Sequence, residues 1–171
     1  MMIGDSTATA VDQYLTFKIG EETYAVDVGG VQRVLEYAPI MKVPGAPPYM
    51  RGVINVMGSV VPVIDLKQKF GMGETERTID TCIVVLELTL DSERSVIGAL
   101  ADSVDEVIEL GADSIEPAPR IGTSINRRYI RGIGKRDDRF LMILDFGEIF
   151  VGEELTTLKE ADDLLPGDPA N

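Results

Sequence analysis

The stretch YMRGVINVMGSVVPVIDL at residues 49–66 recurs eighty residues later as YIRGIGKRDDRFLMILDF at residues 129–146. Four of the 18 aligned positions are identical, and seven more exchange one apolar residue for another. A second pair, VQRVLE at 31–36 and VDEVIE at 104–109, shares three identities at an offset of 73 residues. Two matched blocks in the same order predict a duplication, with two β-rich lobes of about 70 residues built from short strands.

Three further patterns predict hairpins. Apolar and polar residues alternate over 14–19, which predicts a half-buried strand that pairs with the segment TYAVDV at 23–28. Residues 51–64 predict a second hairpin with its turn at Gly58 and Ser59, and residues 79–101 predict a third. Because proline has no N–H to donate to a ladder, Pro62 is expected on an edge strand or at a bulge.

The sequence also predicts short helices. Apolar residues at spacings of three and four indicate one helical turn in each lobe, at Val31, Val34 and Leu35 and at Val104, Val107 and Ile108. Asp65 is followed three residues later by Gln68, and Asp145 by Glu148, so we interpret both aspartates as helix N-caps rather than catalytic carboxylates. Residues 152–165 are predicted to be helical as well.

Charge and composition exclude several classes of function. The net charge of -13, from 29 acids and 16 bases, repels nucleic acid and anionic membrane surfaces. The N-terminus lacks a leader pattern, and no apolar run approaches the ~20 residues of a membrane span. The single cysteine, Cys82, stands in an apolar run and is expected to pack as a small hydrophobe. We expect a soluble cytoplasmic protein that binds no nucleic acid and does not insert into the membrane.

The residue types that usually carry catalysis are scarce. The chain has no histidine, which removes the commonest general base and metal ligand. Gly132 and Gly134 precede Lys135, but not at the spacing of a phosphate loop. A stripe of carboxylates is interpreted as a solvated face rather than a cation site; it comprises Asp102, Asp105, Glu106 and Glu109. We therefore expect no catalytic residue, no cofactor and no metal.

Two surface features remain. Residues 53–64 carry no charge, so one face of these strands is expected in the lobe core and the other against the second lobe or another protein. The basic residues between 127 and 139 are interpreted as a solvated loop or as a contact for an acidic protein, rather than as a nucleic-acid patch.

Taken together in this order, the motifs resemble the CheW family of bacterial chemotaxis coupling proteins over residues 12–155. They are QYLTFKIGEETYAVDV, VQRV, YMRGVINVMGSVVPVIDLKQKFGM, DEVIEL, IEPAP, YIRGIG and RFLMILDF. The resemblance implies a mainly β fold of two SH3-like five-stranded β-barrel lobes packed together, with short helices and a C-terminal helix. Lobe 1 would span about 12–76 and lobe 2 about 77–155, between a flexible N-terminus at 1–11 and an acidic tail at 156–171 that is partly helical or disordered.

The function implied by this resemblance is that of a non-enzymatic adaptor. It would couple the regulatory domain of the histidine kinase CheA to the cytoplasmic tips of methyl-accepting chemoreceptors, in arrays at the inner face of the membrane, with other CheW copies as a further partner. Three alternatives stay open at this point. They are a CheW-like scaffold of a pilus, gliding or developmental pathway, an enzyme with an unfamiliar carboxylate site, and a nucleic-acid module on small barrels.

The resemblance also implies site residues. A receptor-binding groove between the lobes would use Val31, Arg33, Asn55, Met57 and Gly58, and loops at the barrel ends that contain Gly52 and Gly132 would contact the kinase. The chain has Arg33 where the family usually has glutamate and Met57 where it usually has arginine. We interpret the two departures either as altered partner specificity, toward a receptor tip or kinase of a dedicated array, or as a solvated helix residue and a filler.

Overall fold

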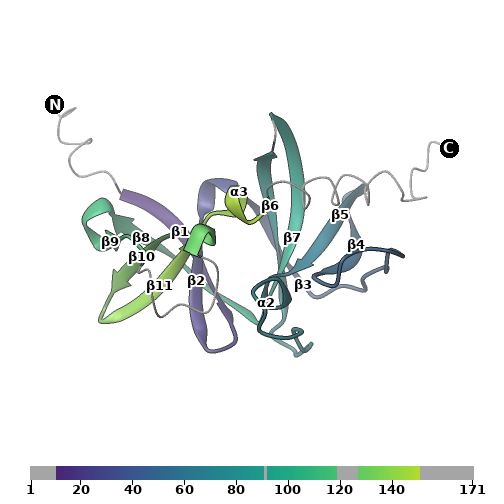
Figure 1. The fold of residues 1–171 in the computed structure, drawn as a ribbon, viewed down its shortest axis with the longest axis horizontal. Coiled ribbons are helices and arrows are strands. Elements are labelled where there is room, and N and C mark those ends of the chain that lie inside the picture. Colours follow the sequence, from purple (N-terminus) through teal and green to yellow (C-terminus); the bar gives the residue numbers. More distant parts are fainter. Residues whose placement is uncertain (1–10, 91, 119–126, 151–171) are drawn as a thin grey trace.

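Short runs of alternating or β-branched residues form eleven strands in the part of the chain that the structure describes. The structure is a computed structural model and describes residues 11–90, 92–118 and 127–150. Figure 1 shows two β-sheets side by side along the long axis of the molecule. The prediction of a mainly β fold is confirmed. The predictions for the first ten residues, the C-terminal helix and the acidic tail lie outside the described residues.

Each sheet forms one lobe. Lobe A holds, in spatial order, β8 (Ser103–Gly111), β1 (Val11–Ile19), β2 (Glu22–Asp27), β11 (Arg139–Leu144), β10 (Ile130–Arg136) and β9 (Ile115–Glu116). Lobe B holds β3 (Val31–Glu36), β6 (Cys82–Leu90), β7 (Glu93–Ala101), β5 (Ser59–Asp65) and β4 (Met50–Val56). The short helices are η1 (Val28–Gly30), α2 (Leu66–Lys69), η2 (Ala112–Ser114), η3 (Arg127–Tyr129) and α3 (Phe146–Ile149).

The two lobes interleave in sequence. The N-terminal hairpin β1–β2 belongs to lobe A, because β2 pairs in parallel with β11 and β1 pairs with β8. In lobe B, β5 pairs in parallel with β7, β7 pairs with β6, and β6 pairs with β3. The hairpin β6–β7 therefore belongs to lobe B. The predicted division of the chain into two lobes at residue 76 is therefore wrong for the hairpins β1–β2 and β6–β7. Lobe A also has six strands rather than five, since the two-residue β9 extends its edge.

The predicted duplication is visible in one hairpin of each lobe. Hairpin β4–β5 leads into α2 as β10–β11 leads into α3, and the amides of Asp65 and Asp145 donate to the carbonyl oxygens of Tyr49 and Tyr129 at 2.7 and 2.9 Å. Both aspartates are N-caps as predicted, with side chains that accept from the amides three residues on, at 3.4 and 3.2 Å.

The predicted helical turns near Val31 and Val104 are wrong, because both segments are strands. Each strand has one extra residue at a bulge, between Val31 and Arg33 and between Val104 and Val107. Val31 and Val104 therefore pack against one hydrophobic cluster, whereas Leu35 and Ile108 pack in two others. The middle residues, Val34 and Val107, face solvent instead. Each segment pairs with a neighbouring strand far along the chain, and this tertiary pairing overrides the local pattern. The carboxylates of the expected helical stripe lie on or beside β8.

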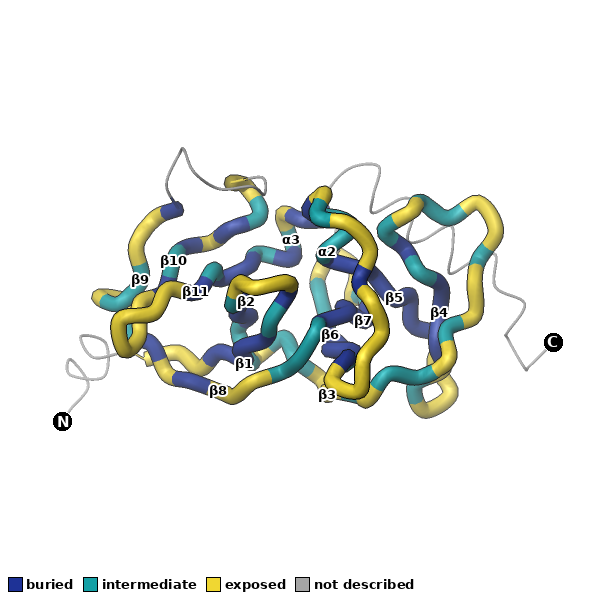
Figure 2. Tube along the Cα trace, turned by 90° about the horizontal axis from the view of Figure 1, so that it is seen from below, coloured by how far each residue is buried: buried dark blue, intermediate teal, exposed yellow. Residues whose placement is uncertain are grey.

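A shared hydrophobic core joins the lobes. It contains buried residues of β1 and β2 together with residues of β4, β6 and β7. Aromatic rings continue across it from Phe17 to Tyr24, from Tyr24 to Phe70 of lobe B, and from Phe70 to Tyr129. Burial raises the pKa of Tyr24 to about 12. In Figure 2, buried segments of the two sheets lie on either side of the region where the lobes meet. The lobes therefore pack as one unit.

Candidate functional site

A groove opens on lobe B, and we call it the lobe-B groove. Its volume is about 460 Å³. It is lined by β3, by the β4–β5 turn, by the first half of β5 and by the first half of β7, at Gln32, Arg33, Val56, Met57, Ser59, Val60, Val61, Pro62, Glu93, Arg94, Ser95, Val96 and Ile97. All of these residues belong to one lobe.

The groove forms where β5 and β7 separate. The two strands pair in parallel only from Val63 and Gly98 onward, whereas residues 59–62 of β5 pair with β4 alone. Pro62 stands immediately before the parallel ladder begins and has no N–H to extend it. The expectation of an edge strand or bulge at Pro62 is wrong, because β5 lies between β7 and β4. Proline is tolerated there because it ends the ladder instead of interrupting it.

The tip of the β4–β5 hairpin is a two-residue turn that exposes Met57. Met57 and Gly58 have φ angles of 51° and 89°, as a type I′ turn requires, and the Asn55 side chain accepts from the Gly58 amide at 2.8 Å. In the duplicated hairpin the same turn consists of Asp137 and Asp138, with φ of 51° and 63°. Aspartate tolerates this left-handed backbone better than methionine does. The Met57 residue is 80% exposed at this turn.

Replacing Met57 with asparagine is expected to stabilise the protein. Asparagine suits the left-handed backbone of the turn, and the methionine side chain makes few contacts that would be lost, so Met57→Asn should raise the free energy of unfolding by about 0.5–1 kcal/mol. Urea unfolding of both proteins measures the difference, with Met57→Leu as a control that should leave it unchanged. Equal or lower stability of Met57→Asn would contradict the strain at this turn.

The charges that line the groove differ in their pairing. Gln32 donates to the Glu87 carboxylate at 3.3 Å, and Arg94 forms an ion pair with the same carboxylate. These hydrogen bonds hold the pKa of Glu87 below its usual value. Glu93 is engaged in an interaction of its own. Arg33 is exposed and makes no ion pair with any described residue.

The residues expected in a receptor groove are brought together only in part. Arg33 and Met57 line the lobe-B groove, and Asn55 and Gly58 shape the turn that presents Met57. Val31 is not among the lining residues; it is half-buried and packs against the shared core. The groove also lies within lobe B, whereas the expectation placed it between the lobes. A pocket lined by described residues of both lobes is smaller, about 150 Å³, and none of the five residues lines it.

The two glycines expected to contact the kinase have a structural role in equivalent places. Gly52 and Gly132 are buried, and each lies where the register of its hairpin shifts. Gly52 has a φ of 145°, and a Cβ there would collide with the carbonyl oxygen of Met41. A Cβ at Gly132 would approach Ile115 Cγ2 to 2.7 Å and the carbonyl oxygen of Glu116 to 3.1 Å. Both glycines let a neighbouring segment approach the hairpin closely.

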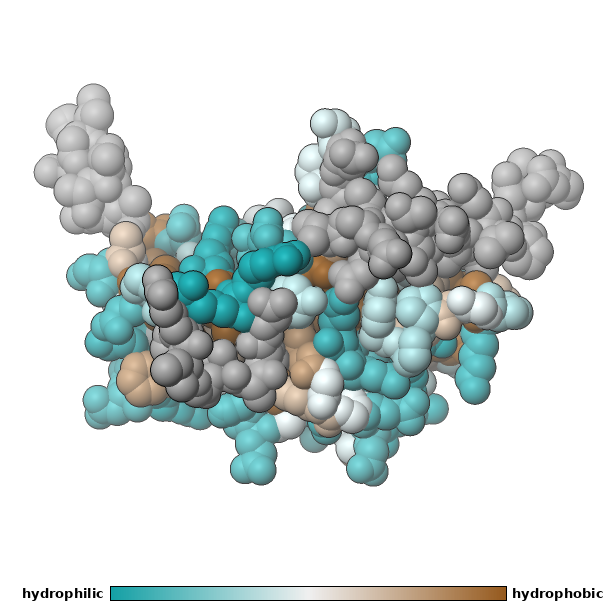
Figure 3. Space-filling model, in the orientation of Figure 1, coloured by the Kyte–Doolittle hydropathy of each residue, from teal (hydrophilic) through white to brown (hydrophobic). Residues whose placement is uncertain are grey.

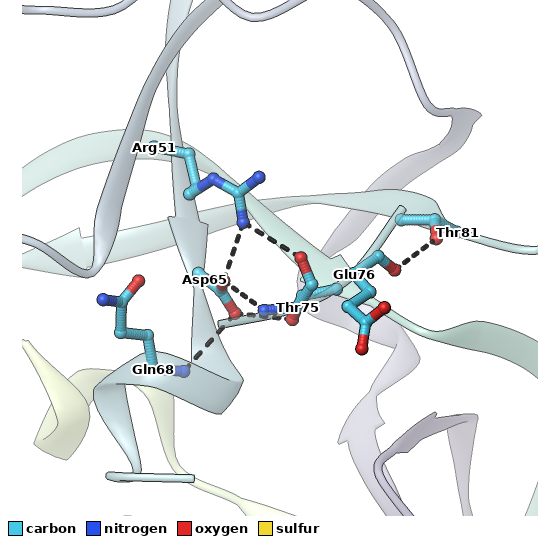
Figure 4. Close-up of polar contacts among 6 residues, drawn as sticks. All are labelled: Arg51, Asp65, Gln68, Thr75, Glu76 and Thr81. Atoms are coloured by element: carbon cyan, nitrogen blue, oxygen red, sulfur yellow. Dashed lines mark hydrogen bonds and ion pairs between the residues drawn. The ribbon is translucent and has the colours of Figure 1, made fainter. Parts of the chain in front are cut away.

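A buried polar network that sequence reasoning missed centres on Asp65 (Figure 4). Its carboxylate is fully buried and accepts from Arg51 Nη1 at 2.9 Å, from the Thr75 amide at 2.9 Å and from the Thr75 hydroxyl at 2.6 Å. Arg51 donates also to the Thr75 carbonyl oxygen at 3.3 Å. The network fastens the loop after α2 to the hairpin. The signal of it in the sequence was the recurrence of arginine at positions 51 and 131 together with aspartate at positions 65 and 145.

Within the described residues, no three Cys, Asp or Glu side chains gather as a metal site would need. No helix there has the length and hydropathy to cross a membrane. Cys82 is half-buried rather than buried, and desolvation raises the pKa of its thiol. Figure 3 shows that the described residues on one face are largely hydrophilic, with apolar residues in small patches between them.

Half of the six basic residues between 127 and 139 form ion pairs with acids of the described residues. Lys135 pairs with Glu116 at 2.7 Å, and Arg136 lies 3.8 Å from Asp137. Arg128 lies 3.6 Å from Glu148. Because these cations are neutralised locally, the cluster fits a solvated surface better than a phosphate-binding patch.

Comparison with known proteins matches this architecture. A family model described as CheW-like domain covers residues 13–154. The chain belongs to the CheW family. The chemotaxis protein CheW of Klebsiella aerogenes is 30% identical over 147 residues, which is 86% of each chain, and that of Bacillus subtilis is 32% identical over 78% of this chain and 83% of the relative.

A solved structure agrees with the fold. The scaffolding protein TtCheW from Thermoanaerobacter tengcongensis superposes with a TM-score of 0.73 at 33% identity, covering 84% of this chain and 90% of that one. The predicted CheW fold of two SH3-like lobes is confirmed. Within this family fold, Arg33 and Met57, the two departures noted in the sequence, line the same groove. Arg33 lies on a strand rather than a helix, but it is exposed as the interpretation of a solvated residue expects.

Proposed function

We propose that this chain is a non-enzymatic chemotaxis adaptor that couples a CheA-type histidine kinase to the cytoplasmic tips of chemoreceptors. Family membership supports the adaptor role, since the relatives are named chemotaxis proteins and the solved neighbour is a scaffolding protein. The observation that carries the receptor assignment is the lobe-B groove, where an exposed methionine projects beside an arginine without an ion-pair partner among the described residues. The adaptor would act in the cytoplasm, recruited to receptor arrays.

The groove supplies what a protein partner needs. Methionine is unbranched and adapts to different partner surfaces, and a few apolar anchors with a polar rim carry most of the energy of an interface of about 1,600 Å². Val56, Val60 and Pro62 provide apolar surface beside Met57. Contacts of modest affinity suffice, because an array holds many copies and multivalency adds avidity. The kinase would bind elsewhere, at the barrel ends whose hairpins Gly52 and Gly132 shape.

The alternatives have less support. The matched relatives are chemotaxis proteins, which does not favour a scaffold of a pilus, gliding or developmental pathway. An enzyme that used Asp65 is disfavoured by the hydrogen bonds that already occupy both oxygens of this carboxylate. The net charge of -13 and the partly neutralised basic cluster argue against a nucleic-acid module.

Co-purification of the full chain with a kinase regulatory domain and with a receptor-tip fragment, separately and together, tests the adaptor role. We expect each pair to form a complex and all three proteins to form a ternary complex, because the two surfaces are separate. Binding to neither partner would refute the role, and mutual exclusion of the partners would refute separate surfaces.

Met57→Asn is expected to weaken binding of the receptor tip about tenfold while the protein itself becomes more stable, since the apolar anchor is lost and the turn is relieved. The matched control is Asp137→Asn in the equivalent turn of lobe A, which should leave binding unchanged. Calorimetric titration with the tip fragment measures both. Equal effects of the two variants would show that the lobe-B groove is not the receptor surface.

A further inference from the structure

We propose that the lobe-B groove selects an acidic partner segment and that Arg33 is the residue that sets this charge preference. The inference rests on the proposed receptor-binding function and adds to it the chemistry of the segment recognised. That segment would present a carboxylate to Arg33 and an apolar side chain to Met57.

The charged side chains of the groove differ in whether they already have a partner. Three charged side chains line the groove, and two of them are already engaged: Arg94 with Glu87, and Glu93 with an interaction of its own. Arg33 is the third, and it makes no ion pair with any residue in the described ranges. A partner that covered this guanidinium without supplying a counter-charge would leave a desolvated, unpaired cation.

Arg33 projects from β3, an edge strand of lobe B. Its backbone position is fixed by the ladder to β6, where Arg33 lies opposite Val85. The chain as a whole carries a net charge of -13 and therefore repels acidic segments at long range. Selection of an acidic segment thus requires a local cation, and arginine suits this role because its planar guanidinium binds a carboxylate through two hydrogen bonds.

The test compares Arg33→Gln and Arg33→Glu with the wild-type chain in titrations of receptor-tip fragments at low and high salt. We expect Arg33→Gln to lose about fivefold in affinity for the tip and Arg33→Glu more than tenfold. The affinity of Arg33→Gln should also depend less on salt than that of the wild-type chain. An acid-to-arginine change in the bound part of the tip should restore binding to Arg33→Glu. Arg139→Glu, an exposed arginine of lobe A, is the control and should bind as wild type.

The outcomes separate this inference from the proposed function. If the wild-type chain binds the tip and Arg33→Glu binds it equally well, the charge preference is refuted while receptor binding stands. If Arg33→Glu loses affinity but no acid-to-arginine change in the tip restores it, the direct carboxylate contact is refuted. Failure of the wild-type chain to bind any tip would overturn both. Circular dichroism and urea unfolding of each variant exclude misfolding as the cause of a loss.

Discussion

Gly52→Ala is expected to lower the free energy of unfolding by about 3–5 kcal/mol. The new Cβ would collide with the carbonyl oxygen of Met41, which bridges to Val53 in the same hairpin, so the backbone must move. The φ of 145° adds strain for any residue with a side chain. A loss of this size is a large fraction of the ~5–15 kcal/mol that stabilises a typical domain. Urea unfolding followed by circular dichroism measures it.

The control for Gly52 is Gly20→Ala in the turn between β1 and β2. Gly20 also has a positive φ, of 65°, but no atom lies within 4 Å of the Cβ that would be added. Its cost should be about 1 kcal/mol, from backbone strain alone. If the two alanine variants lost equal stability, the close approach of the Met41 backbone would not explain why glycine is needed at position 52.

Asp65→Ala is expected to lower the free energy of unfolding by about 3–5 kcal/mol as well. It removes the acceptor for the Arg51 guanidinium and for the amide and hydroxyl of Thr75, and leaves these donors unsatisfied in a mostly buried place. The loop after α2 should also become sensitive to proteolysis, because the network is what fastens it.

The duplication supplies the matched control for Asp65. Asp145 occupies the equivalent position but is only half-buried, and its side chain accepts the Glu148 amide at 3.2 Å as a helix cap. Asp145→Ala should therefore lose about 1 kcal/mol, the usual value of an N-cap. Similar losses for both aspartates would mean that Asp65 acts only as a cap.

The sequence predicted the duplicated hairpins well, because period-two patterns and the recurrence at residues 49 and 129 are local signals. It mispredicted β3 and β8, since a bulge in each strand breaks the two-residue alternation and leaves apolar residues at helix-like spacings of three and four. It could not reveal the interleaved lobes. Their assignment depends on the parallel pairings of β2 with β11 and of β5 with β7, which join segments that no local pattern relates.

The residues of the candidate site were also predicted only in part. Arg33 and Met57 were identified from the sequence as departures from a family pattern, and the fold brings both to one groove. Arg94 and its partner Glu87 were missed, because Gln32 and Arg94 meet the Glu87 carboxylate only once β3, β6 and β7 are assembled. The groove itself follows from the separation of β5 and β7 before Val63, and a proline in the sequence indicates such a separation only after the strand order is known.

Amide hydrogen exchange of the chain with and without a tip fragment shows whether the receptor tip binds the lobe-B groove. We expect slower exchange in residues 32–33, 56–61 and 93–97, and no change at the β10–β11 turn of lobe A. Protection confined to lobe A, or to the smaller pocket between the lobes at residues 26–30 and 144–147, would contradict binding at this groove.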